Sequence, residues 1–446
     1  NPKYRLPEIR YVIEDAKPVL LFTIAHFEQQ SYAPYIQSLQ QDYAFIQRVV
    51  ALTDPIDHCQ RFADFLVLAD DISPQQLADR QQTIDTQDPA LLVYTSGSTG
   101  KPKGALLSHY GLCFGAAVQR QHFQVKQPRI TCSFPINHVA CVADTCCVNL
   151  VAGGTLLLQE RFDAGAQLRA IDKERLSILG GVPTMLMMLL DHPDFASTDF
   201  SSLELIIWGG AAMPIPLIER LQTLAPRLMN VYGMTETAAN TTYTAIDADI
   251  VELSETIGRP SPHMPCRIMN TEGQPCAVGE EGELQFKGEY LLLEYLNRPD
   301  ATRDVYTEDG WLHTGDLGYW RDNGSITLVG RMSEMFKSGG YNVYPREIED
   351  VLENHPAVEM AAVVGVPDDK YQEVGAAFVV LKTLGSAVTE EELTTHCRDN
   401  LANYKVPKTL TLLPSLPTLP VGKVDKVALK KHAKEANQTQ KTAENS

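Results

Sequence analysis

Residues 91–104 have the sequence LLVYTSGSTGKPKG, a short apolar run followed by a loop of glycine, hydroxyl and lysine residues. The apolar run at residues 91–94 predicts a buried strand that leads directly into the loop. Glycine allows backbone angles that turn successive N–H groups toward one point, and such a concave backbone binds anions. Hydroxyl and ammonium groups add the donors and the positive charge that a polyphosphate requires. The stretch therefore predicts a strand followed by a phosphate-binding loop.

The spacing within this loop excludes a Walker-type P-loop, which needs four residues between its two glycines before the lysine. Here Gly97 and Gly100 are too close together, and Pro102 follows Lys101. Two lysines placed after a buried strand also argue against an ordinary surface loop. The candidate ATP-binding residues of the loop are Thr95, Ser96, Gly97, Ser98, Thr99, Gly100, Lys101 and Lys103.

The composition of the 446 residues is that of a globular protein with two or three packing units, at 44% apolar and 21% charged residues. The formal net charge of −18 repels a polyanion, so no nucleic-acid partner is expected. No apolar run reaches the length of a membrane-spanning helix, and none is predicted. Because the overall charge is negative, a phosphate-bearing ligand must be bound by a local site such as the loop.

The cysteines bear on the cellular compartment, and the first residue bears on whether an N-terminal segment is missing. Nine cysteines are present without a CxxC pair or a Cys/His ligand spacing, which favours reduced, mostly buried thiols in a cytoplasmic protein. The chain opens on Asn1, directly in a helix-and-strand pattern. We expect an N-terminal piece to be missing, so a targeting peptide cannot be judged.

The order of apolar runs predicts an α/β fold. Strand-like runs at residues 19–22, 65–68, 176–179, 205–208 and 228–231 alternate with helical segments such as 216–224, a pattern typical of parallel sheets with ligand sites at the strand ends. From about residue 258, shorter strands such as 283–286 and 325–329 and a tight turn at 322–324 predict a small β subdomain.

A compact α+β unit is expected after residues 330–331. Pro345 stands at a predicted helix start, residues 358–366 and 376–381 have strand character, and Thr389 with Glu392 has capping-box spacing. The predicted domains are therefore a large domain, residues 1–330, and a small C-terminal domain, residues 331–446.

The loop resembles the phosphate loop of the adenylate-forming superfamily, which includes acyl-CoA synthetases, beetle luciferases and peptide-synthetase adenylation domains. Further motifs follow in the same order, at residues 209–211, 232–236, 310–316, 330–331, 338–345 and 422–423. The likeness is greatest to acyl-CoA synthetases. It implies a large adenylation domain, N-terminally incomplete here, and a mobile small domain. It also implies an AMP-forming acid–thiol ligase that uses ATP, Mg²⁺ and coenzyme A.

The resemblance also implies roles for residues at the nucleotide. Tyr232 would stack on adenine, Thr235 would contact the α-phosphate, and Glu236 would help hold Mg²⁺, a cation that prefers oxygen ligands. Asp316 would bind the ribose hydroxyls, with Arg331 as a second ribose contact. The nucleotide site would be completed by Gly209, Gly210, Ala211 and Gly233.

Lys423 would be the catalytic lysine, reaching from the small domain to the carboxylate and the α-phosphate, where charge develops as pyrophosphate leaves. The sequence departs from the family pattern at two places. Leu419 stands four residues before Lys423, where relatives have Thr. Ser333 stands at the hinge, where relatives commonly carry Asp or Lys. The departures put the positioning of the lysine and the rate of domain rotation in question.

The same resemblance implies a coenzyme A tunnel lined by Ser338, Gly339 and Gly340, because glycine leaves a narrow thiol path open. His138 is placed with the catalytic residues and as a wall or gate of the acyl pocket. The other expected wall residues are apolar: Val139, Trp208, Met234 and Ala238. Residues 134–141 carry no carboxylate to pair with an α-amine, which argues against amino acids. A fatty, alicyclic or aryl acid is expected, and Trp208 favours medium-chain or ring acids.

Two alternatives stay open at this point. The acyl-adenylate could pass to a carrier protein instead of coenzyme A, although the residues after Lys423 are too few and too polar for us to expect a carrier domain there. The chain could also be a non-catalytic nucleotide-binding protein. The expected partners are a small carboxylic acid and coenzyme A. The oligomeric state, a homodimer included, is not determined by the sequence.

Overall fold

The computed structural model describes residues 1–95, 102–339, 341–368, 370–382, 388–419 and 423–444. Contacts along the chain divide it into two units. The first contains Asn1–Leu112 and Leu292–Arg303, and the second contains Cys113–Leu291 and Asp304–Ser446. Each unit is described by itself. The domain boundary expected at residue 330 stays a prediction.

The first unit is built from short helices, a parallel sheet and an antiparallel hairpin. Strands β1, β4 and β5 pair in parallel, and β6 pairs antiparallel with β7, which in turn pairs with β17. The elements of this unit are α1 (Leu6–Ala16), β1 (Leu20–Thr23), β2 (His26–Phe27), β3 (Gln30–Ser31), α2 (Ala33–Asp42), β4 (Arg48–Ala51), β5 (Gln60–Arg61), α3 (Phe62–Val67), α4 (Pro74–Gln82), β6 (Pro89–Thr95), β7 (Lys103–Ser108) and β17 (Glu294–Tyr295). The strand predicted at residues 91–94 is confirmed within β6, although only Val93 is buried and the other three residues are half-buried.

The strand predicted at residues 65–68 is wrong. These residues lie in α3 and in the 3-10 turn of Leu68–Asp71 that follows it. A short apolar run does not distinguish a strand from a helix by its periodicity. Asp64 in the first turn of α3 favours the helix, because a carboxylate is stabilised near a helix N-terminus.

The second unit contains a five-stranded sheet in the order β10-β11-β12-β13-β14. The first three strands are parallel, as predicted, and β13 runs antiparallel to both of its neighbours, β12 and β14. The bounds are β10 (Ile178–Gly181), β11 (Leu205–Gly209), β12 (Leu228–Gly233), β13 (Asn240–Tyr243) and β14 (Arg259–Pro260). Along β11, Ile206 and Trp208 join one core cluster, and Leu205 and Ile207 join another. Both faces of this sheet are therefore buried.

Helices cover the two faces of that sheet. One core cluster draws residues from α8, α9, α10 and α11, and the other draws residues from α5 and α7 and from the parallel pair β8–β9. The bounds are α5 (His109–Phe123), β8 (Arg129–Cys132), α6 (Val139–Cys141), η2 (Val142–Cys147, a π-helical segment), α7 (Val148–Ala152), β9 (Thr155–Leu158), α8 (Ala164–Glu174), α9 (Pro183–Leu190), α10 (Ile215–Gln222) and α11 (Ile250–Glu255).

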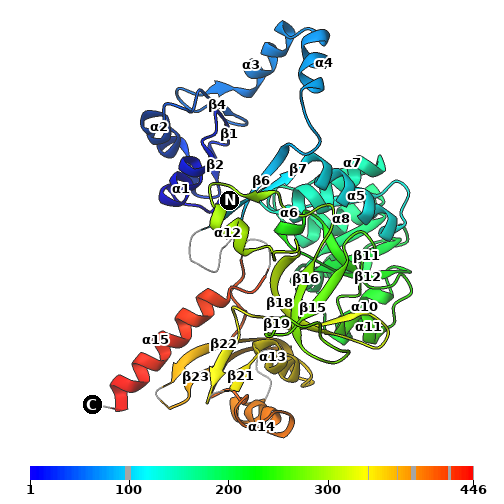
Figure 1. Cartoon of the computed structure of the whole chain (residues 1–446), viewed down its shortest axis with the longest axis vertical. Helices are drawn as coiled ribbons and strands as arrows, with labels where there is room; N and C mark the ends of the chain where they lie inside the picture. Colours follow the sequence, from blue (N-terminus) through cyan, green and yellow to red (C-terminus); the bar gives the residue numbers. More distant parts are fainter. Residues whose placement is uncertain (96–101, 340, 369, 383–387, 420–422, 445–446) are drawn as a thin grey trace. The chain divides into compact units, whose positions relative to one another are not determined.

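The small β subdomain is an antiparallel sheet in the order β15-β16-β18-β19, which Figure 1 shows as one layer. Its strands are β15 (Cys266–Met269), β16 (Gly282–Phe286), β18 (Leu312–Trp320) and β19 (Ile326–Arg331). Between β16 and β18 the chain passes through β17 and α12 (Pro299–Asp304), most of which belongs to the first unit. Asp316 faces Arg331 in the register of β18 and β19. The hairpin predicted around residues 322–324 is therefore confirmed, and it brings two candidate ribose contacts together.

The C-terminal part is the predicted α+β unit. Its sheet has the order β21-β20-β23-β22, and β24 runs parallel to β23. Pro345 begins α13, and Thr389 caps α14 by accepting a hydrogen bond from the Glu392 amide, as predicted. The bounds are β20 (Phe336–Ser338), β21 (Tyr341–Val343), α13 (Pro345–Glu353), β22 (Val358–Asp368), β23 (Gln372–Leu381), α14 (Glu390–Asn400), β24 (Thr409–Leu412) and α15 (Lys426–Glu444). Across the described residues, no helix is both long and apolar enough to cross a membrane.

Candidate active site

The best-defined polar cluster lies where the central sheet meets the β subdomain within the second unit. The Tyr232 hydroxyl, at the end of β12, donates to Oδ2 of Asp316 at 2.5 Å. Nε of Arg331 lies 3.0 Å from Oδ1 of the same carboxylate. Asp316 is only 4% exposed. The structure therefore brings together three residues that the sequence assigned to the nucleoside.

Charge compensation keeps this buried carboxylate able to accept hydrogen bonds. Burial raises the pKa of Asp316, and the Arg331 guanidinium and the Tyr232 hydroxyl oppose that rise. Burial and the Asp316 charge raise the pKa of Tyr232 well above its ordinary value, so its hydroxyl stays a donor. A carboxylate offers about four lone-pair sites. Asp316 therefore retains acceptor capacity for two further O–H groups.

Thr235 and Glu236 lie in a single 3-10 turn, Thr235–Thr237, directly after β12. Glu236 is buried and Thr235 half-buried. The turn ends at Ala238, which has a positive φ of 53°. Burial, followed by the Glu236 charge, raises the pKa of Tyr306. The hydroxyl and the carboxylate of this turn are hard oxygen donors, the set that Mg²⁺ prefers.

Gly210 leaves the space that Lys423 occupies. A Cβ built on Gly210 would lie 2.7 Å from Cε of Lys423, and the φ of Gly210 is +83°. The positive φ favours glycine at this position, and the close approach shows that the end of the Lys423 side chain lies directly against Gly210. The motif at residues 209–211 and the lysine, more than 200 residues apart in sequence, thus meet in the second unit.

A backbone hairpin positions Lys423. The Leu419 amide donates to the Lys423 carbonyl at 2.7 Å, and Thr418 forms a β-bridge with Val424. The Leu419 side chain is 40% exposed. Since the backbone of residue 419 makes the contact, the departure from Thr leaves this hairpin intact. Burial and the Arg331 charge lower the pKa of Lys423, and Asp316 and Glu334 oppose that shift.

His138 lies within electrostatic range of Lys423. Its Nδ1 accepts a hydrogen bond from the Ala140 amide at 3.1 Å, so the ring caps α6. Burial and the Lys423 charge lower the pKa of His138 to about 4. The imidazole is therefore neutral at physiological pH. A neutral ring suits the wall or gate expected of His138.

We expect His138 to make stability depend on pH. The unfolded chain protonates this imidazole near its ordinary pKa of 6.5, whereas the folded chain does so only near pH 4. The contribution of the neutral His138 imidazole to the free energy of unfolding is therefore complete above pH 6.5 and declines as the pH falls toward 4. In His138→Asn the amide oxygen can still cap α6. Urea unfolding between pH 4 and pH 7.5 should show a shallower acid decline in this variant than in the wild type.

The control for this prediction is His58→Asn. His58 is exposed and has a φ of +65°, which Asn tolerates well. This variant should follow the wild-type pH profile. Equal slopes for the wild type and His138→Asn would contradict the assignment of a depressed pKa to His138.

The expected acyl-pocket residues differ in their surroundings. Val139 and Ala238 are buried, and Met234 is half-buried. Trp208 is fully buried in the core cluster with Leu217 and Ile218. Its indole N–H has no hydrogen-bond partner among the described residues. A common pocket for these side chains stays a prediction.

Most of the phosphate loop falls outside the described residues, namely Ser96, Gly97, Ser98, Thr99, Gly100 and Lys101. The loop's two ends lie in the first unit. There Thr95 pairs with Lys103 across β6 and β7. The Lys103 ammonium lies 4.4 Å from the centre of the Tyr295 ring, a cation–π contact that sequence reasoning missed. Its role at a phosphate stays a prediction.

The hinge candidate precedes β20, and the tunnel candidates lie at its end. Ser333 is exposed in the turn after β19, where the Met332 amide donates to the Gly315 carbonyl at 2.8 Å. Ser338 ends β20 and is buried. Gly339 has a φ of +58°, and its amide donates to the Tyr371 carbonyl at 2.9 Å. Gly340 lies outside the described residues.

One charged residue near the site was missed from the sequence. The Lys426 ammonium lies 2.6 Å from Glu334 and 2.9 Å from Glu349. It thereby joins the start of α15 to α13 and to the turn after the hinge candidate. The only signal in the sequence was the position of Lys426 three residues after Lys423. One lysine in a polar tail does not by itself indicate an ion pair.

Family models match most of the chain. The model of the AMP-binding enzyme family matches residues 1–296, and that of the AMP-binding enzyme C-terminal domain matches residues 347–423. A feruloyl-CoA synthase from Amycolatopsis sp is 38% identical over 331 residues, which are 73% of this chain and 66% of that protein. The match thus spans just under two thirds of the length of that relative.

Two further similarities cover almost all of the chain. A 3-[(3aS,4S,7aS)-7a-methyl-1,5-dioxo-octahydro-1H-inden-4-yl]propanoyl:CoA ligase from Rhodococcus jostii is 32% identical over 93% of this chain and 80% of its own. The crystal structure of ATP-bound MatB from Rhodopseudomonas palustris superimposes with a TM-score of 0.82 at 26% identity, over 98% of this chain and 83% of that one. These matches agree with the α/β architecture described above.

Proposed function

Because the chain belongs to the AMP-binding enzyme family, we propose that it is an AMP-forming acid–CoA ligase. The reaction converts a carboxylic acid, ATP and coenzyme A into acyl-CoA, AMP and diphosphate. The observation that carries the proposal is the Lys423 ammonium placed at Gly210, within electrostatic range of Asp316 and His138. A non-catalytic nucleotide-binding protein would not need a lysine held at that point.

In the first half-reaction, a carboxylate oxygen of the acid attacks the α-phosphorus of ATP and diphosphate leaves. Negative charge increases on the α-phosphoryl oxygens in the transition state. A preplaced ammonium in a water-poor site stabilises that charge without having to reorganise. We assign this role to Lys423, and Asp316 with Arg331 would orient the ribose.

A magnesium ion is implied by the family, and the donor set fits it. Glu236 is a buried carboxylate in the same turn as the Thr235 hydroxyl, and hard oxygen ligands suit Mg²⁺. We propose that Glu236 holds the ion and that Thr235 contacts the α-phosphate. When bound, Mg²⁺ would neutralise phosphate charge.

In the second half-reaction, the thiol of coenzyme A attacks the acyl carbon and AMP leaves. We propose that the small domain, residues 331–446, rotates at Ser333 between the two halves and brings Ser338 and Gly339 to the thiol path. The exposed turn at Ser333 supports this, since a hinge needs a few residues that absorb backbone rotation. Lys423 would leave the site in the rotated state.

The acid is proposed to be medium-chain, alicyclic or aryl. The expected wall residues are apolar or neutral, and His138 is uncharged near neutral pH. Feruloyl-CoA synthase and an indoleacetate–CoA ligase are among the similar proteins, and both names specify ring acids. We further propose a cytoplasmic location, which nine free cysteines support.

A panel assay tests the proposal. The protein is incubated with ATP, Mg²⁺, coenzyme A and matched fatty, alicyclic and aryl acids, and AMP and acyl-CoA are measured by mass spectrometry. We expect AMP and thioester in equal amounts, with ring or medium-chain acids preferred over palmitate-length acids. Acyl-adenylate transferred to a carrier protein but not to coenzyme A would contradict the proposed acceptor. Preference for long-chain acids would contradict the proposed substrate class.

A further inference from the structure

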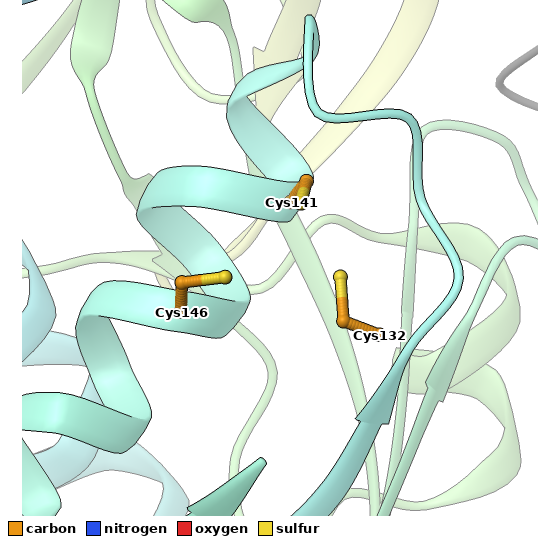
Figure 2. Close-up of side chains that lie close together, drawn as sticks. All are labelled: Cys132, Cys141 and Cys146. Atoms are coloured by element: carbon orange, nitrogen blue, oxygen red, sulfur yellow. The ribbon is translucent and has the colours of Figure 1, made fainter. Parts of the chain in front are cut away.

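Three thiols to which the proposed ligase reaction assigns no role meet in the second unit. The Sγ atoms of Cys132, Cys141 and Cys146 all lie within 4.8 Å of one another. Figure 2 shows the three sulfurs directed toward a common space between a strand end and a helical segment. Cys132 and Cys141 are buried, Cys146 is half-buried, and all three are free thiols.

The local fold explains how residues so spaced come together. Cys132 ends β8, Cys141 ends α6, and Cys146 lies in the π-helical segment η2. In an α-helix, residues five apart are rotated by about 140° from each other. A π-helix closes its turn between such residues, so it places Cys141 and Cys146 on one side. Such segments occur frequently at functional sites.

The sulfur atoms lie close enough together to share one ion. Three sulfurs each held about 2.3 Å from one ion lie about 4 Å apart, within the limit observed here. A disulfide requires sulfurs about 2.05 Å apart and would leave one thiol over. An all-sulfur ligand set selects soft metal ions over Mg²⁺ or Ca²⁺, which take oxygen ligands.

We propose that Cys132, Cys141 and Cys146 form a binding site for one soft, thiophilic divalent cation, separate from the magnesium site at Glu236. The three sulfurs are its ligands, and each ligating thiol releases its proton to solvent. A bound ion links the end of β8 to the π-helical segment. It thereby ties down the stretch that carries His138, three residues before Cys141.

Cadmium binding to the full chain tests this site without any ligase substrate. The protein is kept reduced with a phosphine, which does not compete as a thiol would. We expect one Cd²⁺ per chain with a sulfur-to-metal charge-transfer band and a higher Tm. Single substitutions Cys132→Ser, Cys141→Ser and Cys146→Ser should each weaken binding by at least ~10-fold. The matched control Cys147→Ser, adjacent to the site in the same segment, should bind as the wild type does.

A second measurement needs no variant and stays informative if a buried substitution unfolds the chain. Wild-type protein is alkylated with and without Cd²⁺, and each cysteine is quantified by peptide mass spectrometry. We expect Cd²⁺ to protect Cys132, Cys141 and Cys146 and to leave the exposed Cys113 unprotected. No cadmium bound, or equal protection of all cysteines, would overturn the proposal. Because neither readout involves acid, ATP or coenzyme A, failure of the ligase proposal would be distinguishable from failure of this one.

Discussion

Replacing Lys423 by Ala should lower the rate of acyl-adenylate formation by ~10²–10³-fold, the loss typical of removing one preorganised electrostatic group. The ammonium lies at Gly210, next to the predicted nucleotide residues, and the substitution leaves no charge to stabilise the transition state. The same variant should still convert a supplied acyl-adenylate and coenzyme A into thioester, because Lys423 is proposed to leave the site for that step. Diphosphate release and thioester formation are measured separately.

The matched control is Lys430→Ala. Lys430 is an exposed lysine seven residues along, in α15, and it should leave both half-reactions unchanged. Equal losses in the two half-reactions of Lys423→Ala would contradict the rotation of the small domain. A loss in thioester formation alone would contradict the role of Lys423 in adenylation.

Replacing Asp316 by Asn should raise the KM for ATP by ~10–100-fold, since hydrogen bonds to a charged group contribute about 1.5–3 kcal/mol. The carboxylate accepts from Tyr232 and pairs with Arg331, and its remaining lone pairs are proposed to accept from the ribose. A sharper readout compares ATP with 2′,3′-dideoxy-ATP. The wild type should strongly prefer ATP, and the Asn variant should lose most of that preference.

Two further variants separate recognition from folding. Asp322→Asn changes an exposed carboxylate in the same β18–β19 hairpin and should not alter either KM. Tyr232→Phe removes the hydroxyl that donates to Asp316 but keeps the carboxylate, so the preference for ATP should largely remain. If Asp316→Asn weakened ATP and its dideoxy analogue equally, Asp316 would support the fold and would not read the ribose.

Local signals in the sequence were sufficient for many elements. Pro345 and Thr389 each predicted a helix start, and both are confirmed, because N-terminal proline and capping hydroxyls act within one turn. Residues 65–68 were mistaken for a strand, since an apolar run of four residues fits either structure. Nothing local indicated that β13 joins the parallel strands antiparallel to β12, or that β14 pairs antiparallel with β13, because strand direction depends on long-range pairing.

The candidate site was also predicted only in part from the sequence. The resemblance assigned Asp316, Arg331 and Lys423 to one site, and the structure places them within electrostatic range of each other. The resemblance could not show that the Leu419 backbone positions Lys423, because a backbone hydrogen bond does not depend on residue type. The cysteine cluster was also missed. Its spacing resembles no metal motif, and the π-helical segment that brings two of the thiols together is not encoded by a recognisable pattern.

The route of one oxygen atom tests the central claim most directly. An accepted acid labelled with ¹⁸O in its carboxylate is converted to acyl-CoA with ATP, and the AMP and diphosphate are analysed by mass spectrometry. Formation of an acyl-adenylate predicts one labelled oxygen in AMP and none in diphosphate, because the carboxylate oxygen attacks the α-phosphorus and remains there when the thiol displaces AMP. Unlabelled AMP, or label in any other phosphate product, would contradict the acyl-adenylate and with it the role proposed for Lys423.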